Sequence, residues 1–378
     1  MLNLLPRVIL PHEIVIKKGS IIRLKYLEGR RAIIICSANL FPTTENYQKV
    51  LSYLLAAKFE VNVVKLFSGD PTFASVNKLI IEMNAFKPDT IIAIGGGSIM
   101  DTTKMARLLF DNNENTFSGN SQNLLNMNKS RKTQLILVPT TCGSGSEASS
   151  VAVLKENDLS RKIPFVAPSL IPDIVILDPT LLNTLPLHLT VSTAIDALTH
   201  AFESFSSKLS NAFSESYSRS AAYDISKNLE DLFNPTKQIL CRERLQVAAF
   251  NAGIAQNISS VGASHAIAHS LGSFLNIPHG IANGILLTSI LKFNASFTPK
   301  VAEILNLIGF NGISDFEIWL TRILTMANLP RKWGNYLSEN NRISLNEIAL
   351  VALEDICMKT NPQKLSLEEI TYILQETK

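Results

Sequence analysis

The stretch Ile94-Gly95-Gly96-Gly97-Ser98-Ile99-Met100-Asp101 follows an apolar run and opens a segment with helical periodicity. Three successive glycines let a backbone approach a ligand closely and adopt positive φ. Ser98 can cap the helix that follows, and the free N–H groups at a helix start attract anions. A tight turn from strand to helix needs fewer glycines, so we interpret this stretch as a cradle for a pyrophosphate.

The segments around this loop alternate between short apolar runs and amphipathic stretches. Four runs are typical of parallel strands buried on both faces: Ala32–Cys36, Val61–Leu66, Thr90–Ile94 and Gln134–Val138. Two stretches between them carry apolar residues at helical spacing: Thr44–Lys58 and Thr72–Phe86. This alternation predicts a doubly wound α/β domain with a parallel sheet.

The pattern changes near Pro179–Pro186. Beyond it no segment is typical of a strand, and five are typical of helices: Ser192–Ser206, Ser214–Leu229, Arg242–Asn257, Ser264–Leu275 and Gly284–Asn294. A chain of 378 residues is also too long for one ordinary core. We predict a dinucleotide-binding α/β domain over residues 1–184 and an all-helical domain over residues 185–378, with ligands in the cleft between them.

Composition excludes several classes of protein. The 35 basic and 32 acidic residues give a net charge of +3, which does not indicate binding to nucleic acid or to an acidic membrane surface. No apolar run reaches the roughly 18 residues that a membrane span needs. The four cysteines lie far apart without a C-x-x-C pair, which argues against a disulfide framework or a thiolate zinc site. We expect a cytoplasmic protein.

A second polar loop, Pro139–Glu147, follows the fourth apolar run. Its hydroxyls and glycines can serve the same phosphates or the nicotinamide ribose. Residues 143–148 also fit the pattern G-x-G-x-x-G/A, but two threonines separate them from the strand and no acidic residue follows at the required distance. We interpret that match as a coincidence inside a ligand-binding loop.

Four of the six histidines fall in two zones of the helical half. Asp196 and His200 stand four residues apart, as do His265 and His269, so each pair shares one helix face. His279 follows in a Pro-His-Gly loop. A lone histidine is usually a hydrogen-bonded polar residue, but two such pairs in a histidine-poor chain favour a site for Fe(II), Zn(II) or a similar ion. Helical spacing does not decide which of His265 and His269 binds the metal. It also does not show whether the two zones meet in space.

These motifs together resemble the iron-dependent alcohol dehydrogenase family, which shares its fold with glycerol dehydrogenase and dehydroquinate synthase. The segments that carry the resemblance are GGGSIMDTTK (95–104), PTTCGSGSE (139–147), DPTLLNTLP (178–186), DALTHAFES (196–204) and GASHAIAHSLGSFLNIPHGIANG (262–284). The resemblance implies a metal-dependent oxidoreductase that transfers hydride between NAD(P)(H) and a primary alcohol or aldehyde. It also implies a homodimer, and it makes residues 185–378 the metal-binding domain.

The resemblance implies roles for individual positions. The residues that match the metal ligands, for Fe2+ or alternatively Zn2+, are Asp196, His200, His265 and His279. His269 matches a non-ligand histidine near the nicotinamide, which can relay the hydroxyl proton. The positions that match contacts to NAD or NADP are Ser37, Asp70, Gly96, Gly97, Ser98, Asp101, Thr140, Thr141, Ser144 and Lys162.

Three positions depart from the family's pattern. Ser37 stands where many members have an aspartate that holds the adenosine ribose, so we expect NADP(H) to be accepted, although no arginine or lysine stands beside Ser37 in the sequence. Asp70 replaces an asparagine. Gln256 replaces a phenylalanine of the substrate pocket, and it either contacts a polar aldehyde or turns away and bonds within its helix.

Three other functions compete with the dehydrogenase. A lyase of the dehydroquinate synthase type would need several basic residues to grip a phosphate-bearing substrate, and the segment Asp196–His279 has few. A metal-free reductase of the maleylacetate type departs from the full ligand set, which this chain keeps. A non-enzymatic nucleotide sensor has no reason to keep that set together with His269. The dehydrogenase is therefore the favoured function.

Overall fold

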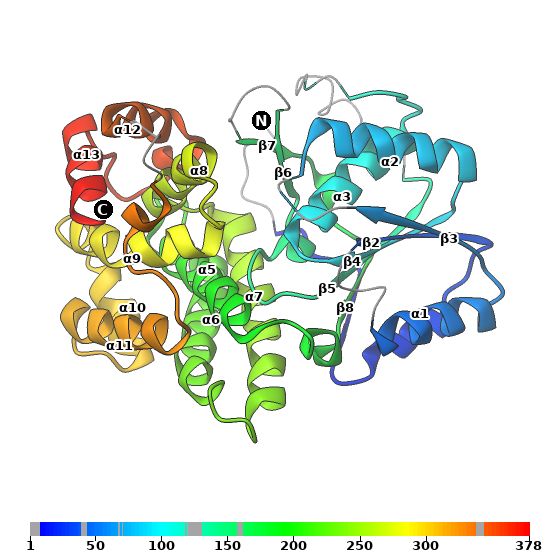
Figure 1. The fold of residues 1–378 in the computed structure, drawn as a ribbon, viewed down its shortest axis with the longest axis horizontal. Coiled ribbons are helices and arrows are strands. Elements are labelled where there is room, and N and C mark those ends of the chain that lie inside the picture. The colour runs from blue at the N-terminus through cyan, green and yellow to red at the C-terminus, as the bar shows by residue number, and fades with distance from the viewer. Residues whose placement is uncertain are drawn as a thin grey trace. The chain divides into compact units, whose positions relative to one another are not determined.

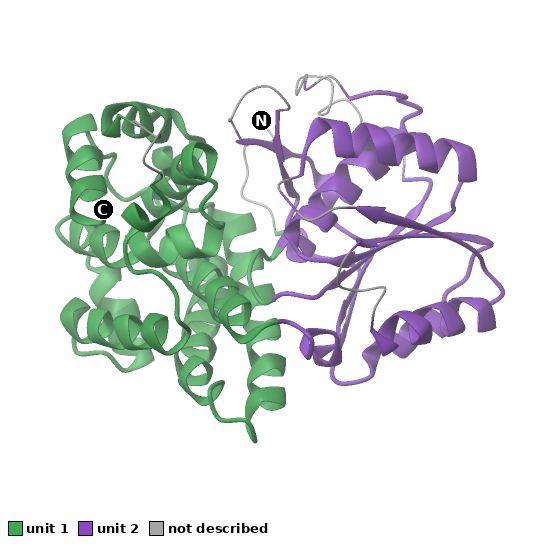
Figure 2. Ribbon diagram, in the orientation of Figure 1, with its two compact units in different colours: residues 1–8, 142–145, 186–378 green, residues 9–141, 146–185 purple. Residues whose placement is uncertain are grey.

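The structure is a computed structural model that describes residues 8–38, 44–66, 69, 71–117, 119, 131–156, 162–337 and 344–378. It divides into two compact units (Figure 2). The α/β unit includes Ile9–Thr141 and Ser146–Leu185, and the helical unit includes Cys142–Gly145 and Pro186–Lys378. The four residues Cys142–Gly145, which belong to the second polar loop, therefore pack with the helices although both flanking segments belong to the α/β unit.

The α/β unit is built on a six-stranded parallel sheet, which confirms the predicted fold class. The strands in spatial order are β1 (Glu13–Ile16), β8 (Ile174–Leu177), β5 (Gln134–Pro139), β4 (Thr90–Gly95), β2 (Arg31–Ser37) and β3 (Glu60–Leu66). The four predicted strands are β2 to β5. The sequence analysis missed β1 and β8, since four residues are too few to show a periodicity.

Helices cover both faces of this sheet, as Figure 1 shows. In β2, Ile33 and Ile35 pack on one face with α2 (Phe73–Phe86) and α3 (Gly97–Asp111). Ala32, Ile34 and Cys36 pack on the other face with α1 (Glu45–Ala56) and the 3-10 helix η2 (Ser20–Tyr26). Successive side chains of a strand point to opposite faces, so two buried faces require a continuous apolar run.

The strand order brings three loops to one edge of the sheet. Strand β4 lies between β2 and β5, with Cys36 opposite Ile94 and Gly95 opposite Pro139. Because the strands are parallel, the segments that follow β2, β4 and β5 all leave from the same edge. Ligands of open α/β sheets bind outside the carboxyl ends of the strands. An antiparallel hairpin of β6 (Val151–Lys155) and β7 (Lys162–Val166), which the sequence analysis also missed, lies outside this sheet.

The helical unit contains no strand within its described residues, as expected. Its α-helices are α5 (Leu187–Ser206), α6 (Ala212–Asp231), α7 (Gln238–Ser259), α8 (Ala263–Leu275), α9 (His279–Ala295), α10 (Lys300–Ile308), α11 (Ile313–Met326), α12 (Leu345–Glu354) and α13 (Leu367–Glu376). Helix α5 packs against α6, α7 and α9. Where the structure describes the chain, none of its helices combines the length and apolarity that spanning a bilayer requires.

Candidate metal centre and cofactor loops

The two histidine zones meet inside the helical unit. Helix α5 carries Asp196 and His200, α8 carries His265, and these three side chains offer ligand atoms within 4.8 Å of one another. His279 lies beside them, with its Nε2 3.5 Å from Oδ1 of Asp196. The expectation that His279 lies in a loop is wrong, because Pro278 caps α9 and His279 is its first residue. A proline fits the start of a helix, where a missing N–H costs nothing.

A glycine brings His279 close to Asp196. A Cβ added to Gly280 would lie 2.2 Å from the carbonyl oxygen of Ser192 and 3.4 Å from Cβ of Asp196. No side chain fits in that space, so only glycine lets the first turn of α9 meet the backbone of α5. The Pro-His-Gly sequence therefore positions His279 through both of its neighbours.

Burial and charge set the protonation of this cluster. Burial alone would raise the pKa of Asp196, but the adjacent His279, His200 and His265 lower it to about 2. Burial lowers the pKa of His200 to about 3, so its ring is neutral at physiological pH. The cluster thus combines a carboxylate with a neutral imidazole, and both are forms that bind divalent metals.

The structure distinguishes the two histidines that helical spacing left equivalent. His265 is 2% exposed and its Nε2 lies 3.9 Å from Oδ1 of Asp196. His269 sits at the border of the cluster, with its ring 6.3 Å from the His265 ring and stacked at 5.1 Å on the ring of His279. Nδ1 of His269 is bonded to Asp355 instead.

Sequence reasoning missed two residues that contact the cluster. Glu203 is buried and accepts a hydrogen bond from Nδ1 of His265 at 2.6 Å, while Asn283 donates to Oδ1 of Asp196 at 2.8 Å. The Asn283 amide nitrogen also lies 3.3 Å from Nε2 of both His265 and His279. Helical spacing could have found both residues, because Glu203 is seven residues after Asp196 and Asn283 is four after His279.

Glu203 also holds the start of α8. Its carboxylate accepts the backbone N–H groups of Gly262 at 2.8 Å and Ser264 at 2.6 Å. Burial acts to lower the pKa of His265, but the hydrogen bond and charge of Glu203, with that of Asp196, raise it. Because a carboxylate only accepts hydrogen bonds, Nδ1 of His265 carries a proton, and Nε2 is the ring nitrogen that a metal could bind.

The glycine cradle differs from the expectation in two ways. The N-cap of α3 is Gly96, so Ser98 already lies inside the helix and does not cap it. None of the three glycines has a positive φ. Space limits two of them instead, since a Cβ on Gly95 would lie 2.7 Å from the Ile99 side chain and one on Gly96 would lie 3.3 Å from Thr141. Gly97 is the first residue of α3, and the approach of this backbone to a pyrophosphate stays a prediction.

The other predicted cofactor residues of the α/β unit lie in different settings. Ser37 ends β2, Thr140 and Thr141 directly follow β5, and Lys162 begins β7. The carboxylate of Asp101 is buried and accepts hydrogen bonds from Oγ of Ser146 at 2.5 Å and from the backbone N–H of Val153 at 3.0 Å. Asp70 lies outside the described residues.

The register of the sheet places an apolar residue opposite Ser37. Strand β3 pairs with β2 so that Lys65 stands opposite Cys36 and Leu66 opposite Ser37. The charge of Lys65 is close enough to lower the pKa of the Cys36 thiol, although burial outweighs it and raises that pKa to about 11. Because successive side chains of a strand point to opposite faces, Lys65 shares the face of Cys36 and not that of Ser37, so β3 offers no lysine beside Ser37.

Gln256 neither bonds within its helix nor stays without a partner. Its amide nitrogen donates to the backbone carbonyl of Ser144 at 2.8 Å. One turn earlier in α7, the Cα of Gly253 approaches so closely that a Cβ on Gly145 would lie 2.4 Å from it. The second polar loop is thus held against α7 by a backbone contact and by Gln256.

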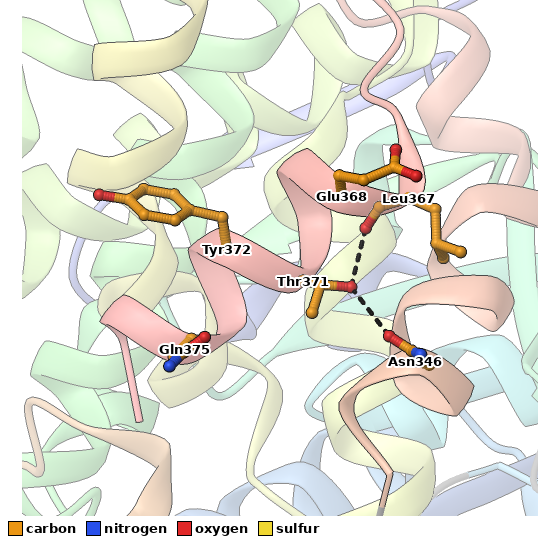
Figure 3. A pocket seen from close by; sticks show the side chains of 6 residues that line it. All are labelled: Asn346, Leu367, Glu368, Thr371, Tyr372 and Gln375. Carbon is orange, nitrogen blue, oxygen red and sulfur yellow. Dashed lines mark hydrogen bonds between the residues drawn. The ribbon is translucent and has the colours of Figure 1, made fainter.

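One surface hollow of about 370 Å³ lies apart from these residues, on α13 and the start of α12 (Figure 3). Its lining residues are Asn346, Leu367, Glu368, Thr371, Tyr372 and Gln375. The Thr371 hydroxyl donates to the carbonyl of Leu367 at 2.8 Å and lies 3.4 Å from Oδ1 of Asn346. No predicted site residue lines this hollow.

Known proteins match the chain along nearly its whole length. Residues 11–179 match the iron-containing alcohol dehydrogenase model, and residues 190–377 match the C-terminal model of the Fe-containing alcohol dehydrogenase family. The chain is 30% identical over 380 residues to the NADPH-dependent butanol dehydrogenase of Clostridium saccharobutylicum, across 98% of this chain and 97% of that protein. The chain belongs to the iron-containing alcohol dehydrogenase family. It is also 30% identical over 372 residues to the 1-propanol dehydrogenase PduQ of Salmonella typhimurium, across 95% of this chain and 96% of that protein.

A solved structure of 1,3-propanediol oxidoreductase superposes with a TM-score of 0.89 at 26% identity, covering 99% of this chain and 100% of that chain. As an iron-type alcohol dehydrogenase, this chain is an NAD(P)-dependent oxidoreductase that acts on alcohol and aldehyde pairs. None of these matches favours the lyase, the metal-free reductase or the nucleotide sensor.

Proposed function

We propose that this enzyme exchanges hydride between NAD(P)(H) and short-chain primary alcohols or their aldehydes. Residues 1–184 would hold the cofactor, and residues 185–378 would hold Fe2+, with Zn2+ as the alternative ion. The proposed ligands are Asp196, His200, His265 and His279. The observation that carries the proposal is the cluster of one carboxylate and three imidazoles, all buried except the partly exposed His279, since this donor set suits Fe(II) and Zn(II).

Each residue of the cluster has a task in this proposal. A metal ion bound there would supply Lewis acidity to the substrate oxygen. Asp196 contributes the negative charge, and Glu203 keeps Nε2 of His265 free to bind. His269, stacked on His279 at the border of the cluster, would accept the hydroxyl proton during alcohol oxidation and return it during aldehyde reduction.

For the cofactor, we propose that NADP(H) is accepted along with NAD(H). Among the described residues, the buried hydroxyl of Ser37 has no hydrogen-bond partner, so it is available to a ribose or to its 2′-phosphate. Ser37 carries no charge to repel that phosphate. The similarity to an NADPH-dependent butanol dehydrogenase agrees with this preference.

The substrate proposal rests on the relatives and on Gln256. The names of the two similar enzymes are butanol and 1-propanol dehydrogenase, which suggests an unbranched apolar alcohol of a few carbons. The Gln256 amide nitrogen is already bonded to Ser144, so its presence no longer requires a polar aldehyde. A homodimer and a cytoplasmic location stay predictions, which light scattering and cell fractionation would test.

Alanine substitutions test the metal assignment. His265→Ala and His279→Ala should abolish both the retention of Fe2+ or Zn2+, measured by mass spectrometry after gel filtration, and turnover of butanal with NADPH. His269→Ala should retain the metal and lower the rate of turnover. His188→Ala, at an exposed position on the same helix as Asp196, serves as the control. If His269→Ala loses the metal while His265→Ala keeps it, the assignment is reversed.

A further inference from the structure

The C-terminal part of the helical unit contributes a carboxylate to His269. Asp355 follows α12 and caps the short 3-10 helix η8 (Ile356–Lys359). Its Oδ2 lies 2.8 Å from Nδ1 of His269, and its Oδ1 accepts the backbone N–H of Cys357 at 2.8 Å. The side chains of His269 and Asp355 are 19% and 15% exposed. This contact joins two residues that are 86 positions apart in the sequence.

The environment keeps Asp355 ionised. Burial acts to raise its pKa, but hydrogen bonds from His269 and Cys357 and the charge of His269 lower it. A carboxylate accepts hydrogen bonds and donates none, so Nδ1 of His269 donates to Asp355 and Nε2 is the ring nitrogen left for another partner. The same ring is stacked on His279 with an interplanar angle of 12°.

We propose that Asp355 is a positioning residue that fixes the orientation and tautomer of His269, so that Nε2 is the atom that accepts the hydroxyl proton. This inference rests on the proposed function, because it assigns a partner to the histidine of that reaction. Asp355 does not touch the proposed metal ligands through any hydrogen bond of the described residues, so its removal should spare the metal. Its loss should lower the rate of proton transfer and leave the binding of substrates unchanged.

A second metal site is the alternative for this group. His269, Asp355 and Cys357 each offer one ligand atom within 4.8 Å of the others. The hydrogen-bond distance between His269 and Asp355 favours the proton-sharing arrangement. Burial and the adjacent Asp355 also raise the pKa of the Cys357 thiol well above its usual range, so a metal would have to displace the thiol proton before it bound the sulfur.

Steady-state kinetics of the metal-loaded enzyme test the proposal. Asp355→Asn should lower kcat about 10- to 100-fold, with the KM for butanal, the KM for NADPH and the metal content unchanged. In a His269→Ala background, Asp355→Asn should cause no further loss, because the two residues act as one unit. Asp355→Ser retains a cap for Cys357 but does not reach His269, so it should lose as much activity as Asp355→Asn. Asp315→Asn, at an exposed position in the first turn of α11, is the control for loss of a helix-terminal charge.

Several outcomes would overturn the proposal. If kcat falls in the double variant by the product of the two single losses, or if Asp355→Asn loses its bound metal, the role of Asp355 is structural. A second equivalent of bound Zn2+ that disappears in both Asp355→Asn and Cys357→Ser would show a metal site instead. Nitrogen-15 spectra of labelled histidines separate this inference from the proposed function. The proton of His269 should move from Nδ1 to Nε2 in Asp355→Asn even if the enzyme turns over no alcohol, and an unchanged tautomer would refute the proposal.

Discussion

Replacing Glu147 with glutamine should stabilise the α/β unit by an amount that grows as the pH rises. Glu147 lies in the 3-10 helix η4 (Ser146–Ala148) and is 2% exposed. Burial raises its pKa from 4.5 to about 7, and the charge of Lys104 only partly opposes this shift. In the unfolded chain the carboxyl group ionises above pH 4.5, whereas in the folded protein it stays protonated until about pH 7. The unfolded state is therefore favoured increasingly between these values.

The size of the effect follows from the two pKa values. For a group that titrates at 4.5 when unfolded and at about 7 when folded, the loss of folding free energy is about 1 kcal/mol at pH 5 and about 3 kcal/mol at pH 7.5. Glutamine has nearly the same shape and cannot ionise, so Glu147→Gln removes this loss. The stabilisation by the variant should thus be about 2 kcal/mol larger at pH 7.5 than at pH 5.

Urea unfolding followed by far-ultraviolet circular dichroism at the two pH values measures this difference. The upper value stays below the pKa of the buried Lys104, which burial lowers to about 8, so the lysine adds little to the comparison. Glu45→Gln removes one exposed carboxylate from the same unit and serves as the control. A stabilisation by Glu147→Gln that does not change with pH would refute the reasoning.

Three further substitutions have defined outcomes. Gly280→Ala would place a Cβ 2.2 Å from the carbonyl oxygen of Ser192, so it should destabilise the protein by about 1–3 kcal/mol or more in urea unfolding and weaken Zn2+ binding in competition with a chelator. Ser37→Asp should raise the KM for NADPH about tenfold relative to that for NADH, because a carboxylate repels the 2′-phosphate; an unchanged ratio would place the ribose elsewhere. Gln256→Leu removes the hydrogen bond to Ser144, so the KM for the cofactor should rise about 3- to 10-fold while the ratio of polar to apolar aldehyde efficiencies stays constant. A change in that ratio would show instead that Gln256 contacts the substrate.

Local patterns in the sequence were sufficient for the parallel sheet and for the helical half. The continuous apolar runs of β2, β4 and β5 predicted strands buried on both faces, and the structure confirms them. Helical spacing also put Asp196 and His200 on one face of α5, because residues four apart on a helix are neighbours. These predictions succeeded because each depends on the residues of one strand or one helix, and not on how two elements pack together.

Contacts between elements were decided only by the tertiary structure. Spacing left His265 and His269 equivalent, and the fold gives them different carboxylate partners, Glu203 from α5 and Asp355 from the start of η8. The sheet register brought Lys65 opposite Cys36 and Leu66 opposite Ser37 at the end of β2. Each of these pairings joins residues from different elements, and the distance between two elements depends on side-chain packing that no local repeat encodes. The sequence by itself determined the elements and the residue types able to bind a metal, while the packing of the helices determined which nitrogen of each histidine faces the site.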